Sequence, residues 1–419
     1  MSCREFPSAP TSAGHGVAFG ADTARPAGAS TAANESETVF ASVAKRPGAV
    51  STAQRSPWPA LNALALVTSL ALGAHTAHAQ AGLLLQGVAD LELWKTDSRS
   101  VLLSRAAGDV APLARAHLWT AVELPGSLTL YAMGEGIGGR AAGETEFELE
   151  QAGARWARSR AFVLDAGMIT SPVGAFAGRR LSSRNPLVGS PDAYPVSYPL
   201  GAQAAGAVGI VDWRAAVVSL PVTHDGYSPE PSTRARPALG LGLTPVVGVH
   251  VGASWTAGSY LANDRPMLAG RAWHDYEQRL LAFDVTASRG YLELWAEAAH
   301  SAYEVPGYAD AVKGMAAYVE ARWTFTPRLY AAARAERNDY PFIEQPTDST
   351  YTATTTDLRN VEAGFGFRPA ASQLVKLTWR RDNWHVAPAV RPYLPDGYAV
   401  AVQFSQSFDV MDLVDRARR

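Results

Sequence analysis

The chain has 419 residues, is 47% hydrophobic but only 18% charged, and carries a formal net charge of -2. A mean hydropathy of -0.06 excludes a protein with several membrane-spanning helices, which needs runs of about 20 apolar residues, and the charge balance excludes the basic footprint of a nucleic-acid-binding protein. The one cysteine, Cys3, lies in a segment that we expect to be removed, so we expect no disulfide, thiolate metal site or cysteine nucleophile.

The first 79 residues predict a disordered extension followed by an export signal. Residues 1–54 are rich in Ala, Ser, Thr, Pro and Gly and lack apolar periodicity, which is typical of disorder. Residues 55–79 contain a basic flank, the apolar run 60–74 and Ala77-His78-Ala79, the three parts of a secretory signal peptide. We expect cleavage after Ala79. Because the extension is longer than a signal needs, we hypothesise that translation begins downstream of Met1, near Val50.

From residue 80 onward the dominant pattern is alternation of apolar and polar side chains. In 397–409, for example, Tyr398 and Val402 share one face, whereas Gln403 and Ser405 share the other. Such a period of two predicts strands that face two different environments. We count about sixteen of these segments. They begin near residues 83, 112, 127, 145, 161, 201, 214, 236, 247, 277, 290, 311, 328, 356, 372 and 397.

The connections between these segments alternate between short and long. The long polar ones fall near residues 95–111, 137–144, 171–200, 223–235, 262–276, 302–310, 339–355 and 382–396. The fold class predicted is all-β: a closed antiparallel transmembrane β-barrel over 80–419 with about 16 strands, short periplasmic turns and long external loops. Closure is required because lipid offers a sheet edge no hydrogen-bond partner. A soluble sandwich or propeller is the alternative, but its strands are shorter and propeller blades repeat at a fixed spacing.

With its signal peptide, cysteine-free body, about sixteen strands and Phe408 near the end of the last strand, the chain resembles the bacterial outer-membrane porins. The resemblance implies a passive diffusion channel for small hydrophilic solutes or ions, not an enzyme, without a cofactor. It also implies a place in the bacterial outer membrane, contact with lipid and lipopolysaccharide, no nucleic-acid partner, and a homotrimer. Segment 165–174 is similar to the G-x-x-x-x-P-x-G stretch of phosphate-selective-type porins. The charged tail 409–419 departs from the family, whose members end at the terminal aromatic residue.

The longest connection, 171–199, is the third long loop, and the resemblance implies that it folds into the barrel and narrows the pore. Its Arg179, Arg180, Arg184 and Asp192 are then constriction residues, and the three cations would favour anions by focusing the field. The alternative is that these arginines are solvated side chains of an external loop.

The parity of each strand predicts which charged side chains face the lumen. The acidic ones are Asp90, Glu92, Glu123, Glu146, Glu148, Asp165, Asp284, Glu293, Glu297, Glu320, Glu336 and Glu362. The basic ones are Arg115, Arg214, Arg322, Arg334, Lys376 and Arg380. The excess of carboxylates favours cations, in conflict with the basic loop. The alternative is that most of these charges pair across strands and stabilise the wall, so ion selectivity stays open.

Other chemistries have weaker support. Residues 134–139 match the dinucleotide-binding pattern G-x-G-x-x-G, but Phe147 and Leu149 alternate with glutamates as in a strand, so we interpret 134–139 as an external loop. None of the six histidines after residue 79 has metal-ligand spacing, and no G-x-S-x-G motif is present. The alternative function is a barrel with a substrate-specific binding or hydrolase role, in which a serine and a histidine such as His117 or His385 meet from distant strands.

Overall fold

The computed structural model describes residues 82–98, 100, 104, 106, 108–143, 145–191, 197–219, 234–261, 271–344, 352–386 and 395–410. The predicted extension, signal peptide and most of the charged tail therefore lie outside the described residues. None of the helices in this part of the chain has the length and apolarity to cross a membrane.

The described chain forms sixteen strands and two short 3₁₀ helices. In order these are β1 Leu83–Thr96, β2 Val110–Leu124, β3 Leu128–Gly138, β4 Glu146–Ser159, β5 Phe162–Met168, η2 Phe176–Arg179, β6 Leu200–Val208, β7 Val211–Val218, β8 Arg236–Val246, β9 Val249–Ser259, η3 Trp273–Asp275, β10 Glu277–Arg289, β11 Leu292–Tyr303, β12 Val312–Thr326, β13 Leu329–Glu344, β14 Thr352–Phe367, β15 Gln373–His385 and β16 Gly397–Asp409.

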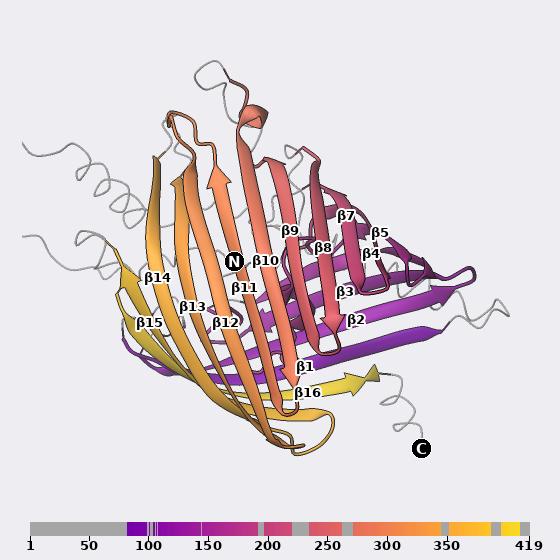
Figure 1. The fold of residues 1–419 in the computed structure, drawn as a ribbon. Coiled ribbons are helices and arrows are strands. Elements are labelled where there is room, and N and C mark those ends of the chain that lie inside the picture. The colour runs from indigo at the N-terminus through magenta and orange to yellow at the C-terminus, as the bar shows by residue number, and fades with distance from the viewer. Residues whose placement is uncertain are drawn as a thin grey trace, which may run out of the picture.

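The strands form one closed ring. Each strand pairs antiparallel with the next along the chain, and β1 closes the ring by pairing with β16 from Gln86↔Asp409 to Thr96↔Ala399. Figure 1 shows β8–β14 as the near wall, with β1–β4 crossing behind them. The prediction of a closed antiparallel barrel of 16 strands is confirmed, and each predicted strand start lies within four residues of an observed one.

The turns on one rim are short, and glycine makes several of them possible. Gly126, Gly209, Gly248 and Gly290 have φ values between 61° and 87°, in the left-handed region that glycine enters without a Cβ clash. Two loop predictions were wrong. Strand β13 continues through Glu344 and β14 begins at Thr352, so much of the expected 339–355 loop is strand. Strand β3 likewise runs through Gly138, so the glycine-rich segment is mostly strand and not an external loop.

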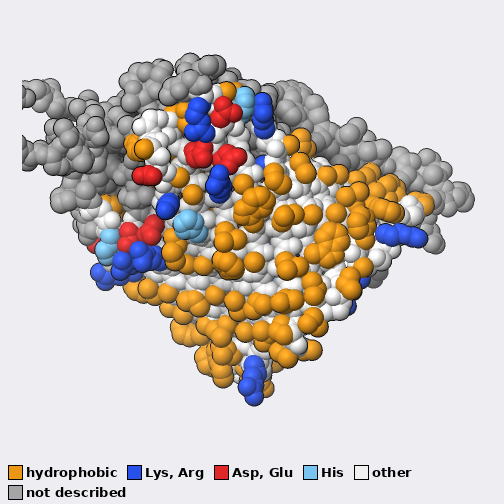
Figure 2. All heavy atoms as spheres, turned by 45° about the horizontal axis from the view of Figure 1, so that its top comes forward, with side chains coloured by type: hydrophobic (Ala, Val, Ile, Leu, Met, Phe, Trp, Pro, Cys, Tyr) orange, Lys and Arg blue, Asp and Glu red, His pale blue; other side chains and the backbone are white. Residues whose placement is uncertain are grey.

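The barrel has an apolar outside and a polar inside. Leu241, Phe283 and Phe365 expose 53–57% of their surface on the outer face, whereas Glu320 and Arg334 are buried inside. Figure 2 shows hydrophobic side chains covering a broad band of one face, with most charged side chains toward its edges. Soluble monomers rarely expose so large a continuous apolar surface. The outer face therefore suits contact with lipid. The alternation along each strand places apolar side chains outside and polar side chains inside, the reverse of the arrangement in a soluble protein.

The chain between β5 and β6 enters the interior. Ile169 and Val173 pack against apolar side chains on the inner face of β7, β8, β10 and β11: Ala216, Val218, Ala238, Leu280, Ala282 and Ala299. The helix η2 follows, and the described residues after it, up to 191, contact several strands across the lumen. We call 169–191 the inner loop.

Candidate pore constriction

The start of the inner loop is fixed to the wall through backbone donors. The Gly174 N–H donates to the Ser254 hydroxyl over 3.0 Å, and the N–H groups of Ala175 and Phe176 donate to the Glu297 carboxylate over 3.0 and 3.2 Å. Glu297 thus accepts the backbone donors at the start of η2, which have no intrahelical partner. This predicted pore-wall residue binds the loop and is nearly inaccessible to water.

Arg179 connects the inner loop to β12. Its Nη1 donates to Glu320 Oε1 over 2.6 Å, and its guanidinium lies 4.2 Å from the centre of the Trp295 ring. The cation therefore has both an anion and an aromatic face as partners, the two surroundings that arginine prefers. Glu320 accepts a second bond from Arg334 Nη1 over 3.1 Å, so one carboxylate joins the loop to β13 as well.

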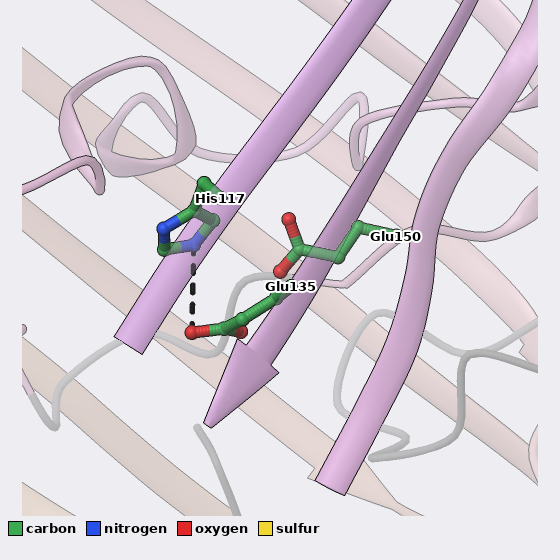
Figure 3. A group of neighbouring side chains, drawn as sticks. All are labelled: His117, Glu135 and Glu150. Atoms are coloured by element: carbon green, nitrogen blue, oxygen red, sulfur yellow. Dashed lines mark ion pairs between the residues drawn. The ribbon is translucent and has the colours of Figure 1, made fainter. Parts of the chain in front are cut away.

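Arg180 connects the loop to strands β2, β3 and β4. One of its terminal nitrogens contacts the Glu150 carboxylate, lies 2.8 Å from His117 Nε2 and lies 3.7 Å from a Glu135 oxygen. Figure 3 shows His117, Glu135 and Glu150 turned toward one another from three neighbouring strands. Arg115 forms a second ion pair with Glu135 over 3.0 Å. We call His117, Glu135 and Glu150 the β2–β4 cluster.

A β-bulge places Glu150 in this cluster. Met133 pairs with Gln151 and the adjacent Gly134 pairs with Leu149, which leaves Glu150 as the extra residue of β4. The extra residue shifts the alternation of β4 by one position beyond the bulge. Glu150 is fully buried inside the barrel, and its Oε2 has no hydrogen-bond partner among the described residues.

The second half of the inner loop lies against β13, β15 and β1. Lys376 Nζ donates to the carbonyls of Ser182, Asn185 and Leu187 over 2.9–3.0 Å. The Ser182 hydroxyl donates to Asp90 on β1 over 2.6 Å. A fully buried ammonium thus replaces its three water contacts with three loop carbonyls, one for each of its donors.

A second charge cluster lies on β12, β13 and β14. Arg334 has no exposed side-chain surface and pairs with Glu320, Glu336 and Glu362 over 3.1, 2.8 and 2.5 Å. It also donates to the Gly189 carbonyl over 2.9 Å. Arg334 is therefore both a neutralising cation for the wall and a donor to the loop.

Several predicted wall residues pair with other side chains of the wall rather than with the loop. Arg155 binds Asp165 over 2.7 Å, and Arg322 forms an ion pair with Glu293. Arg380 binds Glu362 over 3.3 Å and Asp382 over 2.7 Å. Glu146 and Glu148 lie on β4, the strand that carries Glu150 of the β2–β4 cluster. These pairs favour the interpretation in which wall charges stabilise the barrel. Their role in permeation stays a prediction.

Two of the four predicted constriction residues, Arg179 and Arg180, form the ion pairs with Glu320 and Glu150 described above. Arg184 is exposed and donates to the Gly178 carbonyl over 3.2 Å. Asp192 lies outside the described residues.

Sequence reasoning missed the β2–β4 cluster. Glu135 was assigned to an external loop. Alternation placed Glu150 on the face of Glu146 and Glu148, but Glu150 was not among the predicted wall residues. His117 was considered for hydrolysis and was set aside as a metal ligand because of its spacing. The three offer a ligand set with metal-binding chemistry, with ligand atoms within 4.8 Å of one another. Here the Arg180 guanidinium supplies the positive charge at this set.

Comparisons with known proteins support the architecture. No family model matches the chain, and no curated protein matches it. Among solved structures, OmpT of Vibrio cholerae aligns with 79% of this chain and 98% of its own at 10% identity and a TM-score of 0.52. A loop L8 deletion mutant of OmpT aligns with 79% of this chain and 100% of its own at 9% identity and a TM-score of 0.51. Salmonella typhi OmpF, in a complex with daunomycin, aligns with 78% of this chain and 97% of its own at 13% identity and a TM-score of 0.51. The fold of this chain is that of these outer-membrane barrels.

Proposed function

We propose that this protein is a porin of the bacterial outer membrane, a passive diffusion channel for small hydrophilic solutes or ions. The observation that carries the proposal is the closed ring with an apolar outer face and charged inner face, which suits lipid outside and water inside. The fold shared with OmpT and OmpF supports it.

The inner loop supports a constriction within this channel. Arg179 and Arg180 are neutralised by Glu320, Glu150 and Glu135, so their net field in the lumen is small. Arg184 is the exposed cation of the loop, and we assign to it the attraction of anions by field focusing. Replacing Arg184 with Gln is expected to move the reversal potential in a salt gradient toward cation preference.

The finer parts of the proposal concern solute and assembly. The similarity of 165–174 to phosphate-selective porins would favour phosphate, but its Asp165 pairs with Arg155 and its Ile169 and Val173 serve packing. The proposal therefore keeps small hydrophilic solutes of either charge. A homotrimer is supported by β5, whose 7 residues fall short of the about 9–11 that a lipid-facing strand needs. A second copy would cover the part of the wall where β5 is short, and lipid and lipopolysaccharide would cover the rest of the outer face.

An enzymatic or substrate-specific binding role is the second candidate. Of its two candidate histidines, His117 contacts Arg180 and Glu135 and not a serine hydroxyl, so among the described residues this histidine lacks the base–nucleophile contact of a hydrolase. We therefore assign the protein a non-enzymatic role.

Planar-bilayer conductance tests the proposal. The full protein, extracted from the outer-membrane fraction in detergent, is expected to migrate in a heat-modifiable way and to give stepwise ohmic openings. Recovery from another cell fraction, or folded protein that never conducts, would refute the porin assignment. Cross-linking in detergent tests the trimer separately.

A further inference from the structure

Two adjacent residues of the inner loop bind opposite walls of the barrel. Arg179 binds Glu320 on β12, whereas Arg180 binds Glu150 on β4. These strands lie eight strands apart in both directions around the ring. Because adjacent Cα atoms are about 3.8 Å apart, the loop at this point is within one arginine side chain of both walls. It therefore crosses the middle of the lumen and does not follow one side.

Both contacts are built into the protein and are not chance meetings of long side chains. The Glu320 and Glu150 side chains have no exposed surface. Each guanidinium also lies over an aromatic ring, Arg179 at 4.2 Å from Trp295 and Arg180 at 5.1 Å from Tyr198. Charges desolvated in this way are costly to leave without their partners.

The two contacts differ in what supports them. On the side of β12 the loop has further anchors on the strands from β11 to β15: Glu297 on β11 binds the two N–H groups described above, and Arg334 on β13 and Lys376 on β15 bind carbonyls from 182 to 189. On the opposite side, Arg180 contacts the β2–β4 cluster, and the Ser182 hydroxyl binds Asp90 on the adjacent β1. Losing Arg180 therefore removes the contact of the crossing segment with β2–β4, while the Ser182 contact with Asp90 and the other loop contacts stay in place.

We propose that the contact of Arg180 with the β2–β4 cluster sets the width of the aqueous path by fixing the inner loop across the lumen as a transverse strut. This rests on the proposed channel function. Arg180 acts here as a positioning residue: it keeps the loop in place, whereas the solute passes beside it. Glu150, displaced by the bulge, is the wall residue that receives it.

Single-channel conductance and liposome swelling with sugars of increasing size test the strut. Arg180→Ala and, from the wall side, Glu150→Gln are each expected to raise conductance several fold and to admit larger sugars. Arg140→Ala is the matched control, since it removes one ion pair, with Asp109, between two exposed side chains. Heat-modifiable migration shows that each variant is folded.

The outcomes separate the strut from the channel itself. If folded Arg180→Ala and Glu150→Gln keep the conductance and size limit of a conducting wild type, the contact is only structural and the strut is refuted while the porin stands. If wild type and variants all fold but none conducts, the proposed function itself fails. A wild type that conducts poorly beside a strongly conducting Arg180→Ala supports the strut.

Discussion

Lys376→Met should release the second half of the inner loop. The substitution keeps an unbranched side chain but removes the ammonium that donates to the Ser182, Asn185 and Leu187 carbonyls. Each hydrogen bond from a charged donor contributes about 1.5–3 kcal/mol, and a carbonyl left buried without a partner costs about 1–3 kcal/mol. Since these terms are not additive, we expect the free energy of unfolding to fall by about 3–5 kcal/mol, the usual loss when one side of a buried charged contact is removed.

Two assays check this prediction. Urea unfolding of the folded protein in phospholipid vesicles gives the change in free energy. Trypsin gives a local measure, because Arg184 is exposed and lies between the released carbonyls: cleavage after Arg184 should become faster in Lys376→Met. Lys313→Met, at an exposed position of β12, is the control for the same change of side chain. A loss under about 0.5 kcal/mol, within the ordinary range of surface substitutions, with unchanged cleavage at Arg184, would show that the three bonds do not stabilise the loop.

Three further substitutions test the packing and charges around the loop. Arg334→Met leaves Glu320, Glu336 and Glu362 without their shared cation and should lower the free energy of unfolding in urea by about 3–5 kcal/mol. A loss under about 1 kcal/mol would contradict the idea that these carboxylates depend on Arg334. Leu187→Ala opens a cavity among Tyr330, Ala332 and Leu374 and should cost about 2–5 kcal/mol by the same measurement, and an unchanged midpoint would mean that the site collapses fully. Gly366→Ala places a Cβ against the ring of Tyr330, whose hydroxyl donates to the Pro186 carbonyl, and should lower the free energy of unfolding by about 1–3 kcal/mol. Gly178→Ala is the control, because the space around Gly178 is open. Equal melting temperatures for the two variants would refute the clash.

Alternation alone predicted most of the barrel. Tyr398, Val402 and Phe404 face outward, whereas Gln403 and Ser405 are buried inside, as the period of two predicted. This works because lipid and lumen impose opposite demands on successive side chains along every strand. Strand ends were less predictable: β13 continues to Glu344, into a stretch that was predicted to be a loop.

The site was only partly predictable. Parity identified Glu320, Arg334 and Lys376 as interior, and the order of the loops identified 171–199 as the inward one. Neither could show which wall each loop residue reaches, because that depends on contacts between residues up to 194 positions apart. The bulge at Glu150 has no signature in the local sequence, and strict alternation across it gives the wrong face for one side of β4.

Ser182 has a consequence for how the ring is completed. Its hydroxyl binds Asp90 on β1 and its carbonyl accepts from Lys376 on β15, so this one residue connects the two strands between which β16 lies. Ser182 therefore helps to fix the distance between β1 and β15, which β16 spans in the closed ring. The inner loop is thus an internal cross-link of the seam where the two ends of the barrel meet, in addition to its contacts across the lumen.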